Sequence, residues 1–166
     1  MIKIRVNLAQ LDQLKRPVKL AQELLRDLSP VFDEVIHPWM LAHMARQFGS
    51  GGSWGGKPWG RYESEPKYAG MKKALVGHTT PLRWEPGRER LYPSLVQPTH
   101  PEHLWESDRA SARFGTRVPW AADLQRGGIG PYGEPYRPYA ILQTTDAQRR
   151  GLAKRVEKDI MRRING

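Results

Sequence analysis

Glycine and proline interrupt the middle of this 166-residue chain so often that long regular elements are expected only near its two ends. Eleven of the 14 prolines lie between residues 51 and 140, and half of the 16 glycines lie between Gly49 and Gly77. Proline lacks the backbone N–H that helices and sheets use, and glycine loses the most conformational freedom on ordering. The length predicts a single domain, 1–166, with irregular loops at about 49–66, 77–102 and 126–138.

The first residues carry two periodic patterns. Apolar and polar side chains alternate over residues 2–7, which is typical of a half-buried strand. Leucine and other apolar residues then recur every three or four positions over residues 8–28, which indicates one apolar stripe on a helix. Pro17 lies inside that stripe and is expected to kink the helix or to start a new segment.

A second helical segment is expected to begin at Ser29-Pro30. Serine is a favoured N-cap, and proline fits the first helical position because that position needs no N–H donor. An apolar face then continues at helical spacing as far as Gly49, with a bend expected at Pro38. The methionine and tryptophan side chains of this face are interpreted as core residues.

Short elements are expected between the loops. Residues 103–107 and 110–116 predict a hairpin around Asp108, with alternate side chains of the second arm on one face. Residues 118–125 predict a short helix after Pro119, and residues 139–142 a strand or a buried turn. Further apolar residues predict short extended pieces: Leu82, Trp84, Leu91, Tyr92, Leu95 and Val96.

The last helix has the clearest local signals. Thr145 and Gln148 have the spacing of a capping box, and Asp146 suits the positive end of the helix dipole. Four apolar residues follow at four-residue spacing on one face: Leu152, Val156, Ile160 and Ile164. The rest of the helix surface is basic: Arg149, Arg150, Lys154, Arg155, Lys158, Arg162 and Arg163.

Composition excludes several classes of protein. The chain has no cysteine, which excludes disulfides, thiolate metal sites and a cysteine nucleophile. No apolar run has the length of a membrane span, and the charged first residues do not resemble a signal peptide. The formal net charge of +10 is spread along the chain and is densest in the last helix. A soluble basic protein made in a cytoplasm is expected.

No catalytic constellation can be assembled from the sequence. The segment His100-Pro-Glu-His103 has a spacing of three instead of the four of a zinc-binding helix, and proline follows its first histidine. The glycine-rich residues 49–60 lack the Gly-Lys-Ser/Thr ending of a phosphate-binding loop. We therefore expect no enzymatic activity, no cofactor and no metal.

Several segments together resemble the phage virion morphogenesis family, which includes tail-completion and neck proteins. Within that family a Gly-x-Leu-x-x-Ser stretch and a Gly-Thr, Val-Pro-Tyr-Ala, His-Gln-x-Gly pattern are usual. This chain departs from the pattern at Arg90 and Trp120, and by a proline-rich insertion around 80–103. The matching segments are Gln47-Phe48-Gly49, a glycine-rich stretch to Trp59, Tyr68 with Lys72-Lys73, Arg90-Leu91-Tyr92-Pro93-Ser94-Leu95, Phe114-Gly115-Thr116-Arg117-Val118-Pro119-Trp120-Ala121, Leu124-Gln125-Arg126-Gly127-Gly128 and a proline-rich loop before the last helix.

The resemblance implies an α+β fold in which N-terminal helices and a C-terminal amphipathic helix pack on a small mixed or antiparallel sheet. It implies a structural virion protein, a tail-completion, tail-terminator or head–tail joining protein. Such proteins form a homo-oligomeric ring, here expected to have six subunits, between the capsid connector and the tail tube. The partners it implies are further copies of the chain, connector or adaptor proteins and tail-tube proteins, with transient passage of DNA and no membrane. Its expected location is the neck or tail of the virion, after assembly in the host cytoplasm.

Aromatic and basic loop residues without core periodicity are the candidate subunit or partner contacts: Trp54, Trp59, Arg61, Tyr62, Tyr132 and Tyr136. The seven basic residues of the last helix are candidates to face the lumen or DNA. Aromatic residues interleaved with basic ones also suit stacking on single-stranded nucleic acid. A basic single-stranded nucleic-acid-binding module is therefore the alternative function.

Overall fold

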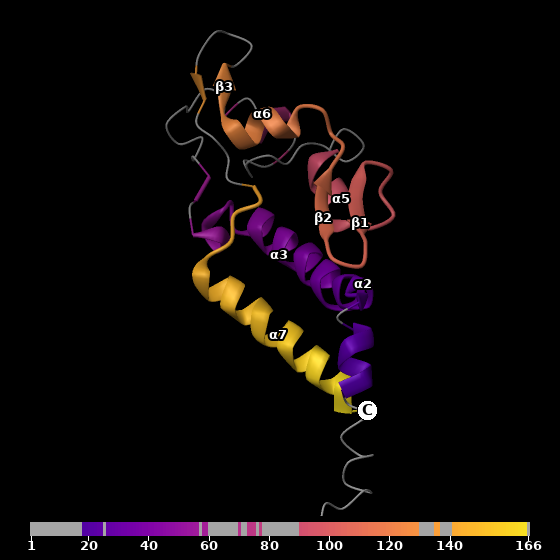
Figure 1. Ribbon diagram of the computed structural model, residues 1–166. Coiled ribbons are helices and arrows are strands. Elements are labelled where there is room, and N and C mark those ends of the chain that lie inside the picture. Colours follow the sequence, from indigo (N-terminus) through magenta and orange to yellow (C-terminus); the bar gives the residue numbers. More distant parts are fainter. Residues whose placement is uncertain are drawn as a thin grey trace, which may run out of the picture.

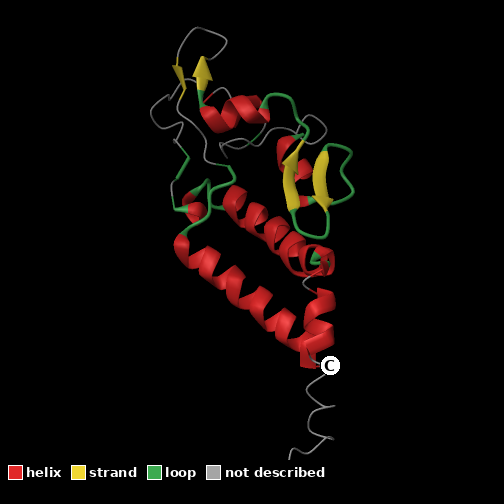
Figure 2. Ribbon diagram, in the orientation of Figure 1, coloured by secondary structure: helices red, strands yellow, loops and turns green. Residues whose placement is uncertain are grey.

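The computed structural model describes residues 18–24, 26–56, 58–59, 70, 73–75, 77, 90–129, 135–136 and 141–165. Within these residues the chain forms helices toward both ends and antiparallel two-stranded sheets between them, which confirms the α+β class (Figures 1 and 2). The predicted strand over 2–7 and the kink at Pro17 lie outside the described residues.

A long helical segment forms the first part of the described chain. Residues 18–24 are helical, and three elements then follow without a break: α2 (Ser29–Val31), the π-helical η1 (Phe32–Ile36) and α3 (His37–Gly49). Pro38 is the second residue of α3, but α3 continues directly from η1, so its missing N–H and its ring fall inside an unbroken helical segment and would disturb a regular helix. The wider π turn directly before it accounts for the irregularity that Pro38 predicts.

The N-cap predicted at Ser29 is wrong. Ser29 is the first residue of α2, and Leu28 occupies the N-cap position without a side-chain cap. Asp27 Oδ1 accepts hydrogen bonds from the Ser29 hydroxyl (2.6 Å) and the Ser29 backbone N–H (2.9 Å). These two bonds lower the pKa of Asp27, because they stabilise its charged form. The side chain of Asp27, and not that of Ser29, therefore accepts a backbone N–H at the start of this helix.

The glycine-rich turn after α3 is tightly packed where it is described. The chain turns through η2 (Ser53–Gly55), which is flanked by Gly52 and Gly56 with φ near +90°. Gly55 is buried, and a Cβ there would lie 2.6–2.8 Å from the Gln47 amide and the Gln143 carbonyl oxygen. Only glycine allows this close approach.

The hairpin has the predicted first arm, and its second arm begins two residues later than expected. β1 (His103–Ser107) pairs antiparallel with β2 (Ala112–Thr116), with His103 opposite Thr116. The Asp108 carboxylate closes the turn by accepting the N–H groups of Ala110 and Ser111 at 2.8 Å. Those bonds, the Ala110 one first, lower the pKa of Asp108.

Short elements lie in and beside two of the expected loop regions, 77–102 and 126–138. The extended pieces predicted around Leu91 and Leu95 are wrong, because Leu91–Val96 forms helix α5 with both leucines buried. The predicted short helix is confirmed as α6 (Ala121–Arg126), which ends at Gly127 with φ +81°. The loop expected over 126–138 contains a two-residue antiparallel pair, β3 (Gly128–Ile129) with β4 (Pro135–Tyr136).

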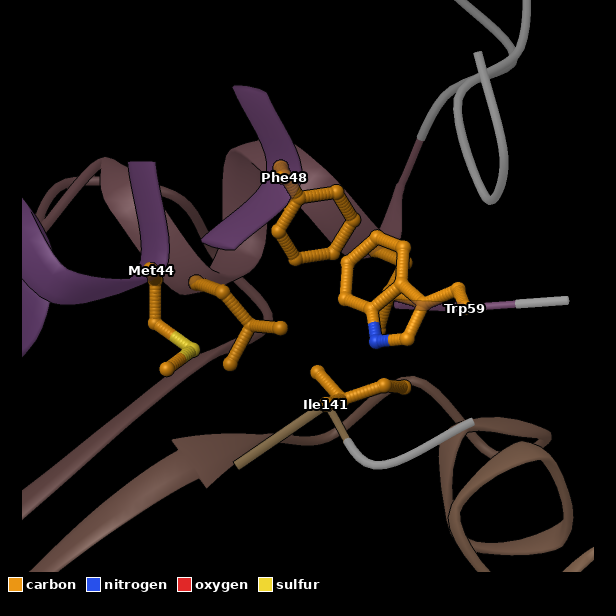
Figure 3. Packing of buried hydrophobic residues seen from close by; sticks show 6 residues of the cluster. Met44, Phe48, Trp59 and Ile141 are labelled. Atoms are coloured by element: carbon orange, nitrogen blue, oxygen red, sulfur yellow. The ribbon is translucent and has the colours of Figure 1, made fainter. Parts of the chain in front are cut away.

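The main core lies between α3 and α5, and Trp59 and Ile141 complete it from outside these helices. Its buried members are Met44, Phe48, Trp59, Leu91, Leu95 and Ile141. Trp59 packs edge-on against Phe48, with ring centroids 4.9 Å apart (Figure 3). Of the strand or buried turn predicted over 139–142, residues 141–142 are described: they form a turn in which Ile141 is buried in this cluster and Leu142 is exposed. Helix α5 also contacts both strands of the hairpin and so joins the hairpin to α3.

Helix α7 (Asp146–Asn165) crosses the side of the molecule away from the hairpin (Figure 1). It was expected on the sheet together with the N-terminal helices, and its main contacts are with η1 and α2. None of the helices in the described ranges combines the length and the apolar character that crossing a membrane requires.

Candidate functional site

Local interactions set the start of α7. The predicted capping box is confirmed: the Thr145 N–H donates to Gln148 Oε1 (2.8 Å), and the Gln148 N–H donates to Thr145 Oγ1 (3.2 Å). The apolar stripe is only half-buried: Leu152, Val156, Ile160 and Ile164. The helix is thus fixed at its N-terminus by caps and along its length by partial burial.

Two aspartates of α7, Asp146 and Asp159, bind some of its basic residues and leave the others without an ion-pair partner in the described part of the chain. Asp159 is buried and binds the guanidinium groups of Arg162 and Arg163, and Arg163 also donates to Glu34 Oε2 of η1 at 2.8 Å. Arg149 pairs with Asp146 in the first turn. Arg163 is only 23% exposed, so its candidacy for the lumen or DNA is wrong: it ties α7 to η1.

The pKa values of this network follow its geometry. Burial raises the pKa of Asp159, but the hydrogen bonds from Arg163 and Arg162 outweigh that effect, so the pKa is lowered overall. The hydrogen bond to Asp159 raises the pKa of Arg163 above its ordinary value. Both groups therefore stay charged over the ordinary pH range.

The other cations of α7 point to solvent. Arg150, Lys154, Arg155 and Lys158 are exposed, and none of them makes an ion pair with a residue in the described part of the chain. Arg162 is 68% exposed although it contacts Asp159. The outward face of α7 is therefore mainly cationic, and its exposed carboxylate Glu157, three residues from Lys154, offsets only part of the charge.

Of the candidate aromatic contacts, Trp54 fits a surface role in part. It is 39% exposed, its indole N–H donates to His43 Nδ1 (3.1 Å), and the Arg46 guanidinium lies 5.0 Å from its ring centroid. Trp54 therefore presents one edge to solvent while its polar group is bonded inside.

Trp59 is not a surface contact. It is 3% exposed and belongs to the core cluster, so this prediction is wrong. The Trp59 backbone N–H donates to the Gly51 carbonyl (2.7 Å), which folds the glycine-rich turn back onto α3 and carries the ring inward. Arg61, Tyr62 and Tyr132 lie outside the described residues, and of Tyr136 only its place in β4 is described.

Sequence reasoning did not assign a role to His43. Its Nε2–H donates to the Gln143 carbonyl (2.9 Å), while its Nδ1 accepts the Trp54 indole N–H. A carbonyl only accepts and an indole only donates, so both bonds require the neutral Nε2–H tautomer. Burial lowers the pKa of His43, and the bond to Gln143 opposes that effect only in part.

A second histidine cluster joins α3 to the hairpin. His37 Nε2 and His103 Nε2 are 3.0 Å apart, and His103 Nδ1 lies 2.7 Å from the Ser94 carbonyl. The Trp105 ring stacks on His37 at 4.3 Å and donates its indole N–H to Asp33. Burial, then the nearby His103, lowers the pKa of His37 against the opposing effect of Asp33. The described residues contain no group of three or more side chains able to hold a metal ion.

Comparison with known proteins adds no relative. No family model, curated protein or solved structure matches this chain. The resemblance to virion morphogenesis proteins therefore rests on the sequence segments quoted above.

Exposed apolar side chains mark further surface that the sequence did not single out. Trp120 at the start of α6 is 42% exposed, Leu142 is 42% exposed, and Met161 of α7 is 50% exposed. Apolar residues were expected to be buried wherever periodicity placed them, and only the packing of neighbouring elements reveals these exceptions. With Trp54, Val18 (56% exposed) and Leu75 (58% exposed), these three residues are the large exposed apolar residues of the described part of the chain and its candidate contacts.

Proposed function

We propose that this chain is a structural subunit of a tailed-bacteriophage virion, a tail-completion, tail-terminator or head–tail joining protein. In this role it forms a homo-oligomeric ring between the capsid connector and the tail tube. The proposal assigns the chain an assembly role and no reaction. It takes its biological setting from the sequence resemblance and its physical support from the distribution of apolar side chains.

The observation that carries the proposal is the placement of large exposed apolar residues on separate elements. Trp120 lies directly before α6, and Met161 lies in the last turns of α7. Trp54 belongs to η2 in the glycine-rich turn. A ring needs two different, complementary surfaces on each subunit, because head-to-tail contacts are what close a ring. Tryptophan and methionine are enriched in such contacts.

The segments that carry the resemblance mainly build the core. Phe48 is buried in the last turn of α3, and Val118 is buried before α6. Leu91 and Leu95 are buried in α5. Residues of this kind specify a fold more directly than a partner. The resemblance therefore supports a shared architecture first, and the assembly role is inferred through it.

The test is the mass of the purified protein over a range of concentrations, with negative-stain images of any assembly. We expect closed rings, formed either by the free protein or after addition of purified phage heads or tails. A protein that stays monomeric at high concentration and also fails to join heads or tails would refute the proposal.

A further inference from the structure

We propose that the outward face of α7 binds the phosphate backbone of duplex DNA through Arg150, Lys154, Arg155 and Lys158. This inference deepens the proposed function and rests on it for its setting, since a ring at a head–tail junction borders the path of the genome. Its physical argument comes from α7 alone.

The first support is the sorting of charge around α7. The buried Asp159 and the η1 residue Glu34 are both bound to Arg163, and Asp146 is bound to Arg149. The four outward cations have no carboxylate partner among the residues described. Four solvated cations outnumber the one exposed acid near them, Glu157, and such an excess attracts a polyanion, whose counterions are released on contact.

The second support is the spacing of the cations. Arg150, Lys154 and Lys158 follow one another at four-residue intervals, so they form a row along one side of the helix. With a rise of about 1.5 Å per residue, successive members are about 6 Å apart along the axis. Duplex DNA carries a phosphate about every 3.4 Å of its axis on each strand, so a row of this length meets several phosphates.

The composition of the face favours duplex DNA over other polyanionic partners. The apolar stripe of α7 faces η1 and α2, so it is not free to enter a lipid surface. Helix α7 contains no aromatic residue on which unpaired bases could stack, which disfavours single strands.

The experiment measures binding of a fluorescently labelled duplex between about 50 and 200 mM salt, where counterion release changes affinity steeply. A labelled single strand and anionic vesicles are measured under the same conditions. The test variant is Arg150→Gln with Lys154→Gln and Lys158→Gln. The matched control is Lys73→Gln with Arg109→Gln and Arg126→Gln, which removes the same charge from exposed positions outside α7. Circular dichroism and oligomer mass are recorded for every sample.

We expect the α7 variant to bind at least tenfold more weakly at low salt. We also expect its plot of log affinity against log salt to lose about 2 to 3 units of slope, because three phosphate contacts are lost. The control should keep the wild-type slope. Equal losses in both variants, no duplex binding by the wild type, or tighter binding to single strands or anionic vesicles would each overturn the proposal. The oligomer mass reports separately on ring formation, so failure to bind DNA would leave the ring proposal standing.

Discussion

His43 connects three segments that are far apart in the sequence. Its imidazole belongs to α3, accepts from Trp54 in the glycine-rich turn and donates to Gln143 just before α7. The Trp39 ring stacks on the His43 imidazole, with ring centroids 5.0 Å apart. Because only the neutral ring satisfies both bonds, protonation of His43 would break at least one of these links and weaken the contact between the segments.

We expect the protein to lose stability as the pH falls from about 7.5 to about 5. The pKa of His43 is lowered by folding, so the unfolded chain, with a histidine pKa near 6.5, takes up a proton before the folded chain does. Stability is therefore fully present above pH 6.5 and falls as the pH drops toward the pKa of the folded state. His37 changes stability in the same direction, since its pKa is also lowered. Urea unfolding at several pH values measures the loss.

His43→Gln separates the contribution of His43 from that of other groups. A glutamine amide donates and accepts hydrogen bonds but does not titrate in this range. We expect the variant to be less stable than the wild type at pH 7.5 and to lose less stability on acidification. An unchanged pH dependence would show that His43 is not responsible.

Two glycines should respond to alanine in opposite ways. Gly55→Ala places a methyl group within 3 Å of the Gln143 carbonyl oxygen and the Gln47 amide, and should cost about 1–3 kcal/mol of unfolding free energy. Gly151→Ala fills open space in the interior of α7 and should add about 0.5–1 kcal/mol. The urea midpoints of the two variants, compared with that of the wild type, measure these changes in unfolding free energy. A neutral Gly55→Ala would contradict the close packing of this turn.

At the scale of elements, local chemistry could be predicted from the sequence and long-range contacts could not. The capping box was expected from the spacing of Thr145 and Gln148, and the hairpin around Asp108 was expected from its two flanking arms. Helix α5 was expected to be extended because Pro93 lies within it, although proline is tolerated in a first turn. The pairing of Arg163 with Glu34 joins residues 129 positions apart, and no periodicity reveals it.

The two aspartates of α7 test what burial does to an ion pair. Asp159 and Asp146 each bind an arginine three residues later, but Asp159 is 9% exposed and Asp146 is 74% exposed. Asp159→Asn leaves Arg163 with a weaker partner in a partly buried position, and should cost about 2–4 kcal/mol. Asp146→Asn should cost less than about 1 kcal/mol. Thermal unfolding compares them, and equal losses would argue against a structural role for Asp159.

At the scale of the whole molecule, a tryptophan inside the small core and one outside it are expected to have different roles. Eight apolar side chains are buried in the described part of the chain, and Trp59 is among them while Trp120 is not. Trp59→Ala should cost about 3–5 kcal/mol, because it opens a large cavity beside Phe48.

Trp120→Ala should change stability by less than about 0.5 kcal/mol and should reduce the fraction of assembled protein. Unfolding curves and native mass separate the two effects. A Trp120 variant that assembles as the wild type does would remove this residue from the proposed contacts.

The candidate site was predictable only at the level of residue type. The sequence identified α7 as basic, and the spacing of Asp159 and Arg163 is that of a helical ion pair, but the contact of Arg163 with Glu34 exists only in the fold. The sequence treated Trp54 and Trp59 alike, because both lie in the glycine-rich loop and neither shows core periodicity. The backbone bond from Trp59 to Gly51 is what turns one ring inward and leaves the other at the surface.

The pairing of α7 with the N-terminal helices also has a consequence for the order of folding. Helix α7 is synthesised after every other described element, and its partners η1 and α2 are about a hundred residues upstream. Contacts between such distant residues form late, because closing the intervening chain costs entropy first. During synthesis the apolar surface of η1 and α2 therefore remains open until α7 arrives, and chains that stop short of α7 are the ones expected to aggregate.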